Sequence, residues 1–247
     1  MPFTFSHPAI VLPLLNRNKS RILFSSTGLV IGSIIPDFES FIRFDQHKQY
    51  SHTWLGIFWF DLPLAILFSF IFHSIVRDPL IENLPKSIGA KFYGYLGFNW
   101  NIFFKKHFIV VIYSMLIGIA SHLLWDAFTH LNLADPNAID SKIRIGGFRL
   151  FILLQYACSL IGLFVVIWYI LKDWKLFVEE KSPETNRTVY WSLVPIIAGL
   201  TMAISIYLIS EPLNMIWFIE IAISGILGAL ILAPLLQKMI FSKRTVK

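Results

Sequence analysis

Three residues with metal-binding side chains recur at helical spacing near the middle of the chain. His122, Asp126 and His130 stand four residues apart, so they share one face of a helix with about 3.6 residues per turn. Ser114 and Gly118 extend that face toward the amino terminus. An imidazole and a carboxylate one turn apart can bind one metal ion together. His130 lies about 12 Å of rise from His122 and is a weaker candidate for the same ion.

Further candidate ligands precede this helix in the sequence. They are His7, Asp37, Glu39, His47 and His52. Because the chain has a single cysteine, any metal site must use His, Asp or Glu side chains. A lone histidine, or a His-x-x-x-Asp pair, is common in proteins without a metal. A metal site is therefore indicated only if several of these side chains converge on one side of the protein.

The composition is that of a membrane protein. Hydrophobic residues make up 56% of the 247 residues and charged residues only 15%, against about 25% charged in ordinary soluble domains. The chain also holds 23 Phe and 8 Trp, which is more apolar surface than one soluble core would bury. We therefore predict an all-α, polytopic membrane helical bundle. The net charge of +6 is typical of such a protein and does not indicate nucleic-acid binding.

Five apolar segments are long enough to cross a hydrocarbon core of about 30 Å as helices. They are Trp54 to Val76, Phe108 to Phe128, Leu150 to Leu171, Trp191 to Ile209 and Met215 to Leu236. Two shorter segments, Pro8 to Leu15 and Ile22 to Ile35, cannot span the membrane alone. We predict that these two form an amino-terminal helical hairpin.

Proline residues set the predicted limits of this hairpin. Pro8 is expected at the first helical position with an extended His7 before it, and Pro36 is expected to end the second helix. Gly28 and Gly32 form a face of small residues on which another helix can pack closely. The two ends of a hairpin meet, so His7 and the Asp37 that follows Pro36 are predicted neighbours.

Lysine and arginine alternate along the chain in step with the apolar segments. Sixteen of the 21 fall in residues 16–21, 77–107 and 172–190 and in the carboxyl-terminal tail, and five fall in the alternate connections. The positive-inside rule then predicts an amino terminus outside the cell and a carboxyl terminus in the cytoplasm. Under this topology all of these candidate ligands lie on the outer side or within a turn or two of it.

Several short motifs, taken in order, resemble a family of bacterial integral-membrane proteins. The motifs are Ser6-His7, Pro36-Asp37-Phe38-Glu39, Tyr50-Ser51-His52-Thr53 and Ser121-His122-x-x-x-Asp126-x-x-Thr129. They are similar to those of the membrane-bound metal-dependent hydrolases. The opening residues 1–8 and the segment 124–130 are closer still to a related branch that is a domain-of-unknown-function family. The resemblance covers residues 1–135.

The resemblance implies a metal site and an activity. The implied metal ligands are His7, Asp37, His52, His122 and Asp126. A more distant similarity to zinc-dependent phospholipase C and P1-type nucleases implies phosphoester cleavage. Zn²⁺ is the expected ion, and Mn²⁺ or Fe²⁺ would suit the same ligands. Asp37 or Glu39 would accept the proton of the attacking water.

The sequence thus predicts a hydrolase of the bacterial inner membrane, with an outward-facing site for a phosphoester or lipid-like substrate. Membrane lipid is the expected partner. Residues 1–135 would form the metal-site domain and residues 136–247 a scaffold of membrane helices. Two other functions fit the same residues. In an ion or proton-coupled transporter, Asp61 and Glu220 would line a path with His122 and Asp126. A metal-stabilised scaffold would use the site without turnover.

Overall fold

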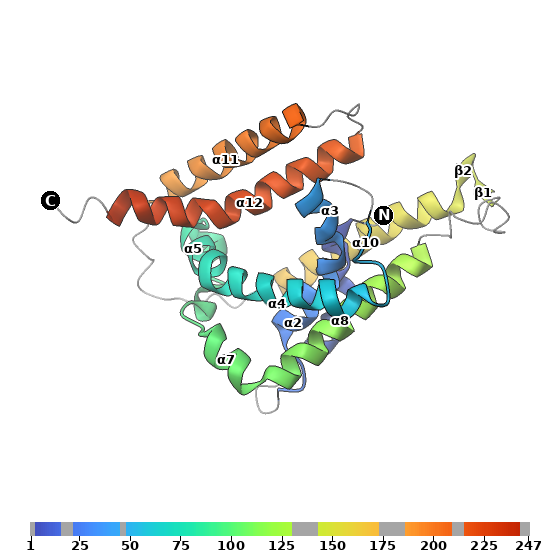
Figure 1. The fold of residues 1–247 in the computed structure, drawn as a ribbon, viewed down its shortest axis with the longest axis horizontal. Helices are drawn as coiled ribbons and strands as arrows, with labels where there is room; N and C mark the ends of the chain where they lie inside the picture. Colours follow the sequence, from blue (N-terminus) through green and yellow to red (C-terminus); the bar gives the residue numbers. More distant parts are fainter. Residues whose placement is uncertain are drawn as a thin grey trace. The chain divides into compact units, whose positions relative to one another are not determined.

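A computed structural model describes residues 3–15, 22–44, 48–129, 143–172, 186–208 and 215–242. Five helices within these ranges are long and apolar enough to cross a membrane (Figure 1). They are Ile57–Asn83, Phe108–Ala127, Ile152–Lys172, Arg187–Leu208 and Trp217–Phe241. The prediction of an all-α membrane protein with five long spans is confirmed.

The chain folds into two compact units, each built from segments that are far apart in the sequence. The first unit contains Met1–Phe38, Gln49–Ile66 and Phe104–Trp174. The second contains Glu39–Lys48, Leu67–Phe103 and Lys175–Lys247. The predicted division at residue 135 into a metal-site domain and a scaffold of membrane helices stays a prediction.

Short helical segments open the first unit, and two long helices complete it. Its elements are η1 (Thr4–Ser6), α1 (Pro8–Val11), η2 (Leu12–Leu14), α2 (Ser26–Ile34), η3 (Ile35–Asp37), η4 (Ile57–Asp61), α8 (Phe108–Thr129), β1 (Arg144–Ile145), β2 (Phe148–Arg149) and α10 (Leu150–Lys172). α1 packs against α2, as the predicted hairpin requires. α2 ends at Ile34, and Pro36 lies in the tighter η3 turn that follows.

α2 lies directly against α8 (Figure 1). Glycines on both helices permit this contact. A Cβ atom on Gly32 would collide with the carbonyl oxygen of Met115, and a Cβ atom on Gly118 would lie 2.7 Å from the backbone nitrogen of Ser33. The predicted small-residue face of Gly28 and Gly32 is therefore the face that meets α8.

The conformation predicted for His7 is wrong. Pro8 is the first residue of α1, as expected, but His7 is helical with φ −58° and ψ −35°, and its N–H donates to the Thr4 carbonyl oxygen at 3.3 Å. The extended bias of a residue before proline is only a preference. Here the segment is also held from outside, because η1 packs on α10 and the Phe3 N–H donates to Ser159 Oγ at 2.8 Å.

A small β-hairpin precedes α10. β1 and β2 pair antiparallel, with Arg144 opposite Arg149 and Ile145 opposite Phe148. The two-residue turn between them is Gly146-Gly147, and both glycines have positive φ, 58° and 85°. Such a turn matches the twist of a hairpin and is open mainly to glycine. These short strands are the part of the described fold that the all-α prediction did not contain.

The remaining elements build the second unit and the connections to it. They are α3 (Phe38–Arg43), α4 (Leu62–Ile71), η5 (Phe72–Val76), α5 (Arg77–Asn83), α6 (Lys86–Gly89), η6 (Tyr93–Tyr95), α7 (Trp100–Lys106), α11 (Arg187–Leu208) and α12 (Met215–Ser242). α3, α4 and α7 have residues in both units. α11 and α12 pack along each other (Figure 1) around buried Tyr190, Ala198 and Ala229.

The first long helix begins and ends later than predicted. It begins at Ile57 rather than Trp54, because the preceding residues form a turn. It runs past Val76 to Asn83, because Leu84 precedes Pro85 and takes an extended conformation with ψ 151°. The length of the apolar run indicates where a helix can cross the membrane, and the extended Leu84 before Pro85 marks where this helix stops.

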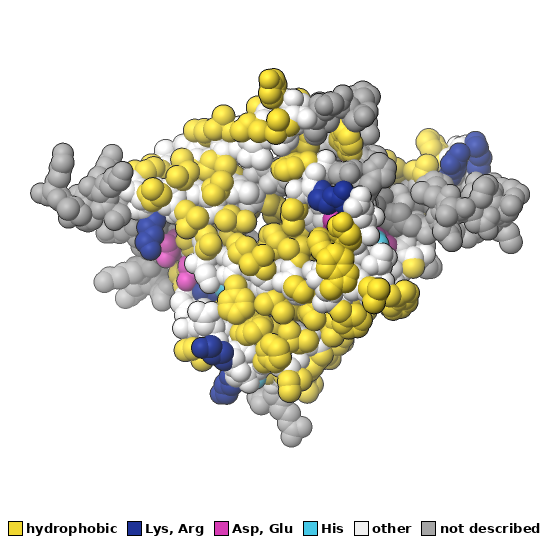
Figure 2. Space-filling view, viewed as in Figure 1, with side chains coloured by type: hydrophobic (Ala, Val, Ile, Leu, Met, Phe, Trp, Pro, Cys, Tyr) yellow, Lys and Arg dark blue, Asp and Glu magenta, His cyan; other side chains and the backbone are white. Residues whose placement is uncertain are grey.

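Large hydrophobic side chains are widely exposed on the described part of the chain. Figure 2 shows them covering much of the face in view, with lysine and arginine side chains in a few separate places. Trp168 on α10 and Leu200 on α11, for example, are each more than half exposed. Such surface is typical of helices that face acyl chains. The chain is therefore a multi-pass membrane protein.

Candidate metal centre

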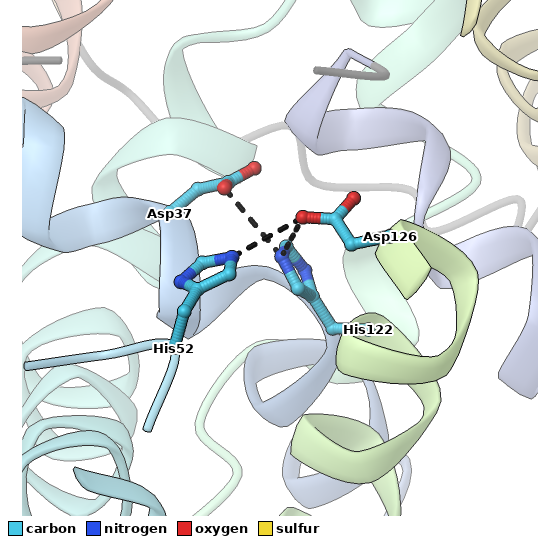
Figure 3. A group of neighbouring side chains, drawn as sticks. All are labelled: Asp37, His52, His122 and Asp126. Carbon is cyan, nitrogen blue, oxygen red and sulfur yellow. Dashed lines mark hydrogen bonds and ion pairs between the residues drawn. The ribbon is translucent and has the colours of Figure 1, made fainter. Parts of the chain in front are cut away.

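Four of the predicted ligands come together within the first unit. Asp37, His52, His122 and Asp126 each offer one ligand atom, and these atoms all lie within 4.8 Å of one another. Figure 3 shows the four side chains pointing toward a common centre. Asp37 ends η3, His52 lies in the turn before η4, and His122 and Asp126 lie one turn apart on α8.

His122 is fixed by a hydrogen bond to the neighbouring helix. Its Nδ1–H donates to the carbonyl oxygen of Ser33 at 2.9 Å. Ser33 is in the last turn of α2, where carbonyl groups have no partner within the helix. Because Nδ1 carries the proton, the neutral ring has its lone pair on Nε2. A histidine that ligates a metal is typically oriented in this way, by a bond from its other nitrogen to a carbonyl group.

The Nε2 atom of His122 faces two carboxylate oxygens. It lies 3.5 Å from Asp37 Oδ1 and 3.5 Å from Asp126 Oδ2, beyond the usual range of about 2.7–3.2 Å for a hydrogen bond. His52 Nε2 lies 3.2 Å from the same Asp126 oxygen. Two ligands of a tetrahedral zinc ion, with bonds of about 2.0–2.1 Å, are about 3.3–3.4 Å apart. The observed spacing therefore suits atoms that share one ion.

Asp37 is held by a hydroxyl group at the start of the chain. Thr4 Oγ1 donates to Asp37 Oδ2 at 2.6 Å, and the other oxygen, Oδ1, is the one that faces His122. Both Thr4 and Asp37 are buried. The hydrogen bond thus fixes the carboxylate plane and assigns one oxygen to the threonine and the other to the cluster.

His52 lies on the exposed side of the cluster. Its side chain is 27% exposed, whereas those of His122 and Asp37 are at most 1% exposed. The hydroxyl group of Ser51 lies 3.0 Å from His52 Nδ1, on the side of the ring away from Asp126. Among the four side chains, His52 therefore marks the side from which water can reach the centre.

His7 lies beside the four-residue group and is fully buried. Its ring stacks on that of His122, with centroids 3.9 Å apart and planes 19° apart. Its Nε2 atom lies 3.7 Å from Asp126 Oδ1, the oxygen that does not face His52 or His122. The expected proximity of the amino terminus to the centre is thus present in the structure. The assignment of His7 as a metal ligand stays a prediction.

Glu39 has an ion-pair partner of its own. It is fully buried on α3, and its Oε1 accepts a hydrogen bond from Arg43 Nη1 at 2.9 Å. Glu39 belongs to the second compact unit, whereas the four-residue group lies in the first. Its predicted role as a proton acceptor stays untested. His47 and His130 lie outside the described residues.

The chemistry of the group fits a divalent cation. It holds two carboxylates and two imidazoles, and three of these four side chains are buried. Buried carboxylates in one cluster require a positive charge close to them. A metal cation would supply that charge, and mixed nitrogen and oxygen ligands suit Zn²⁺, Mn²⁺ or Fe²⁺. An ion that accepts five or six ligands would keep room for water beside these four.

Three residues that support the centre were not predicted from the sequence to have a functional role. They are Thr4, Ser33 and Ser51, which contact Asp37, His122 and His52 respectively. The hydroxyl group of Thr4 donates a hydrogen bond to Asp37, and the hydroxyl group of Ser51 forms one with His52. Ser33 accepts a hydrogen bond from His122 with its backbone carbonyl group. A signal was present for Ser51, which directly precedes a candidate ligand. No spacing rule links Ser33 to His122, because this pair forms only when α2 packs on α8. Thr4 meets Asp37 because the two ends of the amino-terminal hairpin lie together.

Comparison with known proteins gives a family but no activity. Residues 1–238 match the family model described as a domain of unknown function, DUF4184. No curated protein and no solved structure matches the chain. The family description names no reaction. Since the match covers nearly the whole sequence, the chain belongs to the DUF4184 family.

Proposed function

We propose that this protein is a membrane-embedded, metal-dependent hydrolase. Asp37, His52, His122 and Asp126 would bind one divalent cation, with zinc expected and manganese or iron as alternatives. His7, stacked on His122 and facing the second oxygen of Asp126, would complete the ligand set. The observation that carries the proposal is the pair of 3.5 Å distances from His122 Nε2 to two carboxylate oxygens.

The negative charge of Asp37 and Asp126 could also be compensated without a metal ion. If His122 carried a second proton on Nε2, the imidazolium would compensate the two carboxylates without any metal. That arrangement would leave the centre without metal, whereas a metal-stabilised scaffold would hold the metal without turnover. The hydrogen bond from Nδ1 to Ser33 is compatible with either state. Metal content and turnover, measured together, therefore distinguish the hydrolase, the metal-stabilised scaffold and the metal-free centre.

Each residue has a role in the proposed reaction. The cation, when bound, would lower the pKa of water and polarise a phosphoryl oxygen. Thr4 holds Asp37 in place, and Ser33 holds His122. Asp37 would accept the proton of the attacking water, a role that the sequence predicts for Asp37 or Glu39. His52, at the exposed side, would meet the substrate first.

A phosphoester is the substrate class that we propose. The ordered motifs resemble membrane-bound metal-dependent hydrolases and, more distantly, zinc-dependent phospholipase C and P1-type nucleases. A cation held by Asp37, His52, His122 and Asp126 would stabilise negative charge on a phosphoryl oxygen. The same resemblance supports a place in the bacterial inner membrane. An outward-facing centre is supported by lysine and arginine, which alternate in step with the spans.

The experiment is hydrolysis of bis(p-nitrophenyl) phosphate by the detergent-purified protein. We expect turnover that a chelator abolishes and that added Zn²⁺ or Mn²⁺ restores. His122→Ala should lose at least a hundredfold of the rate, since it removes a ligand from the centre. His107→Ala, a histidine before α8 and outside the four-residue group, is the matched control and should keep the rate. Metal-replete protein without turnover on this or other phosphoesters would contradict the proposal.

A transporter is the second candidate, and one observation favours it. Asp61 is fully buried at the end of η4, within the first long span and on an element that packs against α8. Carboxylates inside spans often lie on ion or proton paths. Asp61→Asn should abolish ion flux in a transporter and leave phosphodiester hydrolysis within about twofold in a hydrolase. Flux in proteoliposomes and hydrolysis in detergent, measured on the same variant, separate the two functions.

A further inference from the structure

The turn that carries His52 also exposes a group of large apolar side chains. Trp54 is 86% exposed and Leu55 is 77% exposed, and Phe58 and Trp59 in η4 follow at 62% and 54%. All four lie within seven residues of His52, the exposed member of the candidate metal centre. We call Trp54, Leu55, Phe58 and Trp59 the aromatic lip.

The backbone of this turn is fixed rather than loose. Thr53 Oγ1 donates to the Tyr50 carbonyl oxygen at 2.8 Å and accepts from the Gly56 N–H at 2.9 Å. The Gly56 Cα lies so near Tyr50 that a Cβ atom there would collide with the Tyr50 carbonyl oxygen. The Tyr50 ring in turn packs edge-on against Trp59, with centroids 5.1 Å apart. The lip is thus held at a set position relative to His52.

No charged residue interrupts this stretch. Residues 49–60 contain no Lys, Arg, Asp or Glu. A site that draws a small anion from water usually has cationic side chains at its mouth, which raise the local concentration of the anion. Here the residues that follow the exposed ligand in sequence offer apolar and aromatic surface instead. Tryptophan in particular is enriched at the level of the lipid headgroups, where its ring is partly in lipid and partly in water.

We propose that the aromatic lip positions a membrane phospholipid whose phosphoester enters the centre past His52. The inference rests on the proposed hydrolase function and names the substrate of that same site. The acyl chains and glycerol of the lipid would lie against Trp54, Leu55 and Phe58, and its phosphoryl group would reach the cation. In the reaction the oxygen of water bonds to phosphorus, the phosphorus–oxygen ester bond breaks, and the leaving oxygen takes up a proton.

The role of the aromatic lip is tested with a variant that removes apolar surface and leaves the candidate metal ligands unchanged. Trp54→Ser combined with Leu55→Ser removes the two most exposed side chains of the turn. Leu124→Ser is the matched control, because Leu124 is 68% exposed on α8 between His122 and Asp126 in sequence but on a different face of the helix. Metal content is measured for each variant, and Trp54→Ser alone replaces the double variant if the latter loses metal.

Two substrates separate the lip from the chemistry. The protein is reconstituted in vesicles of phosphatidylethanolamine and phosphatidylglycerol for the lipid assay, and bis(p-nitrophenyl) phosphate is the water-soluble probe. We expect the double variant to lose at least tenfold in lipid cleavage while soluble-probe hydrolysis stays within about twofold. Leu124→Ser should keep both activities.

The possible failures differ from one another. Lipid cleavage that is equal in wild type and the double variant overturns the role of the lip and leaves the hydrolase intact. Hydrolysis of the soluble probe without any lipid cleavage by the wild type also overturns the inference alone. Absence of hydrolysis of both substrates by metal-replete wild type overturns the proposed function and the inference together.

Discussion

His122 donates its Nδ1–H to the carbonyl oxygen of Ser33, 2.9 Å away on the neighbouring helix. This bond joins the orientation of a candidate ligand on α8 to the packing of α2. The packing in turn depends on Gly32 and Gly118, which leave room for the two backbones to approach. The orientation of His122 therefore depends on the packing of α2 against α8. A substitution that disturbs this packing should also change metal affinity.

The hydrogen bond from Thr4 to Asp37 should be important for metal affinity. Thr4→Val keeps the shape of the side chain but removes the donor, so one oxygen of Asp37 loses a bond of 2.6 Å. Loss of a partner that orients a metal ligand ordinarily costs about tenfold to hundredfold in affinity. We expect a loss of that size in zinc titrations. Thr201→Val, which removes a hydroxyl bonded to a backbone carbonyl on α11, should leave affinity unchanged. Equal affinity in Thr4→Val and wild type would contradict the role of Thr4.

The sequence predicted the spans and much of the cluster for simple physical reasons. Apolar length indicates a crossing helix without reference to its neighbours. Helical periodicity places His122 and Asp126 on one face, and the alternation of charge suggested which connections share a side of the membrane. These two regularities predicted only that Asp37 and His52 lie on the same side of the membrane as that face, and the resemblance to membrane-bound metal-dependent hydrolases implied that they join His122 and Asp126 as ligands.

Other features depended on packing that no local pattern encodes. His7 is helical because η1 is held on α10 and bonded to Thr4, whereas the rule for a residue before proline favoured an extended backbone. The carbonyl oxygen of Ser33 became a partner of His122 only through the contact of α2 with α8. The division into two compact units also follows from contacts between distant segments. The order of the spans along the sequence does not predict those contacts.

His7 should contribute to metal binding if it completes the ligand set. His7→Gln preserves polarity and most of the volume but places an amide where Nε2 now faces Asp126 Oδ1 at 3.7 Å. We expect the bound metal to fall about as far as in His122→Ala. His107→Gln, outside the four-residue group, serves as the control. Full metal content in His7→Gln, with His122→Ala depleted, would place His7 outside the coordination sphere.

The contact of α2 with α8 should tolerate no side chain at Gly32. Gly32→Ala places a methyl group against the Met115 carbonyl oxygen, and overpacking of this kind costs about 1–3 kcal/mol of stability. The thermal midpoint in detergent should fall, together with zinc affinity. Gly228→Ala on α12, where a Cβ atom would meet nothing within 4 Å, should leave the midpoint unchanged or raise it. A midpoint for Gly32→Ala at or above that of wild type would show that the helices can separate without cost.

The predicted topology can be checked by labelling from each side of the membrane. In a Cys158→Ser background, cysteine at position 19 should react only with reagent on the cytoplasmic side and cysteine at position 48 only from outside. The reason is the excess of lysine and arginine on one set of connections. Reaction of both cysteines from the same side would contradict the outward-facing centre.

The most direct test of the account is the metal content of the purified protein. Elemental analysis of detergent-purified wild type, beside His122→Ala and the control His107→Ala, measures whether the four-residue group binds a cation. The account predicts about one equivalent of zinc, manganese or iron in wild type and in His107→Ala, and less than about a tenth of an equivalent in His122→Ala. Folded wild-type protein that remains free of metal after incubation with each of these ions would contradict it, and the two carboxylates would then be compensated by a protonated His122.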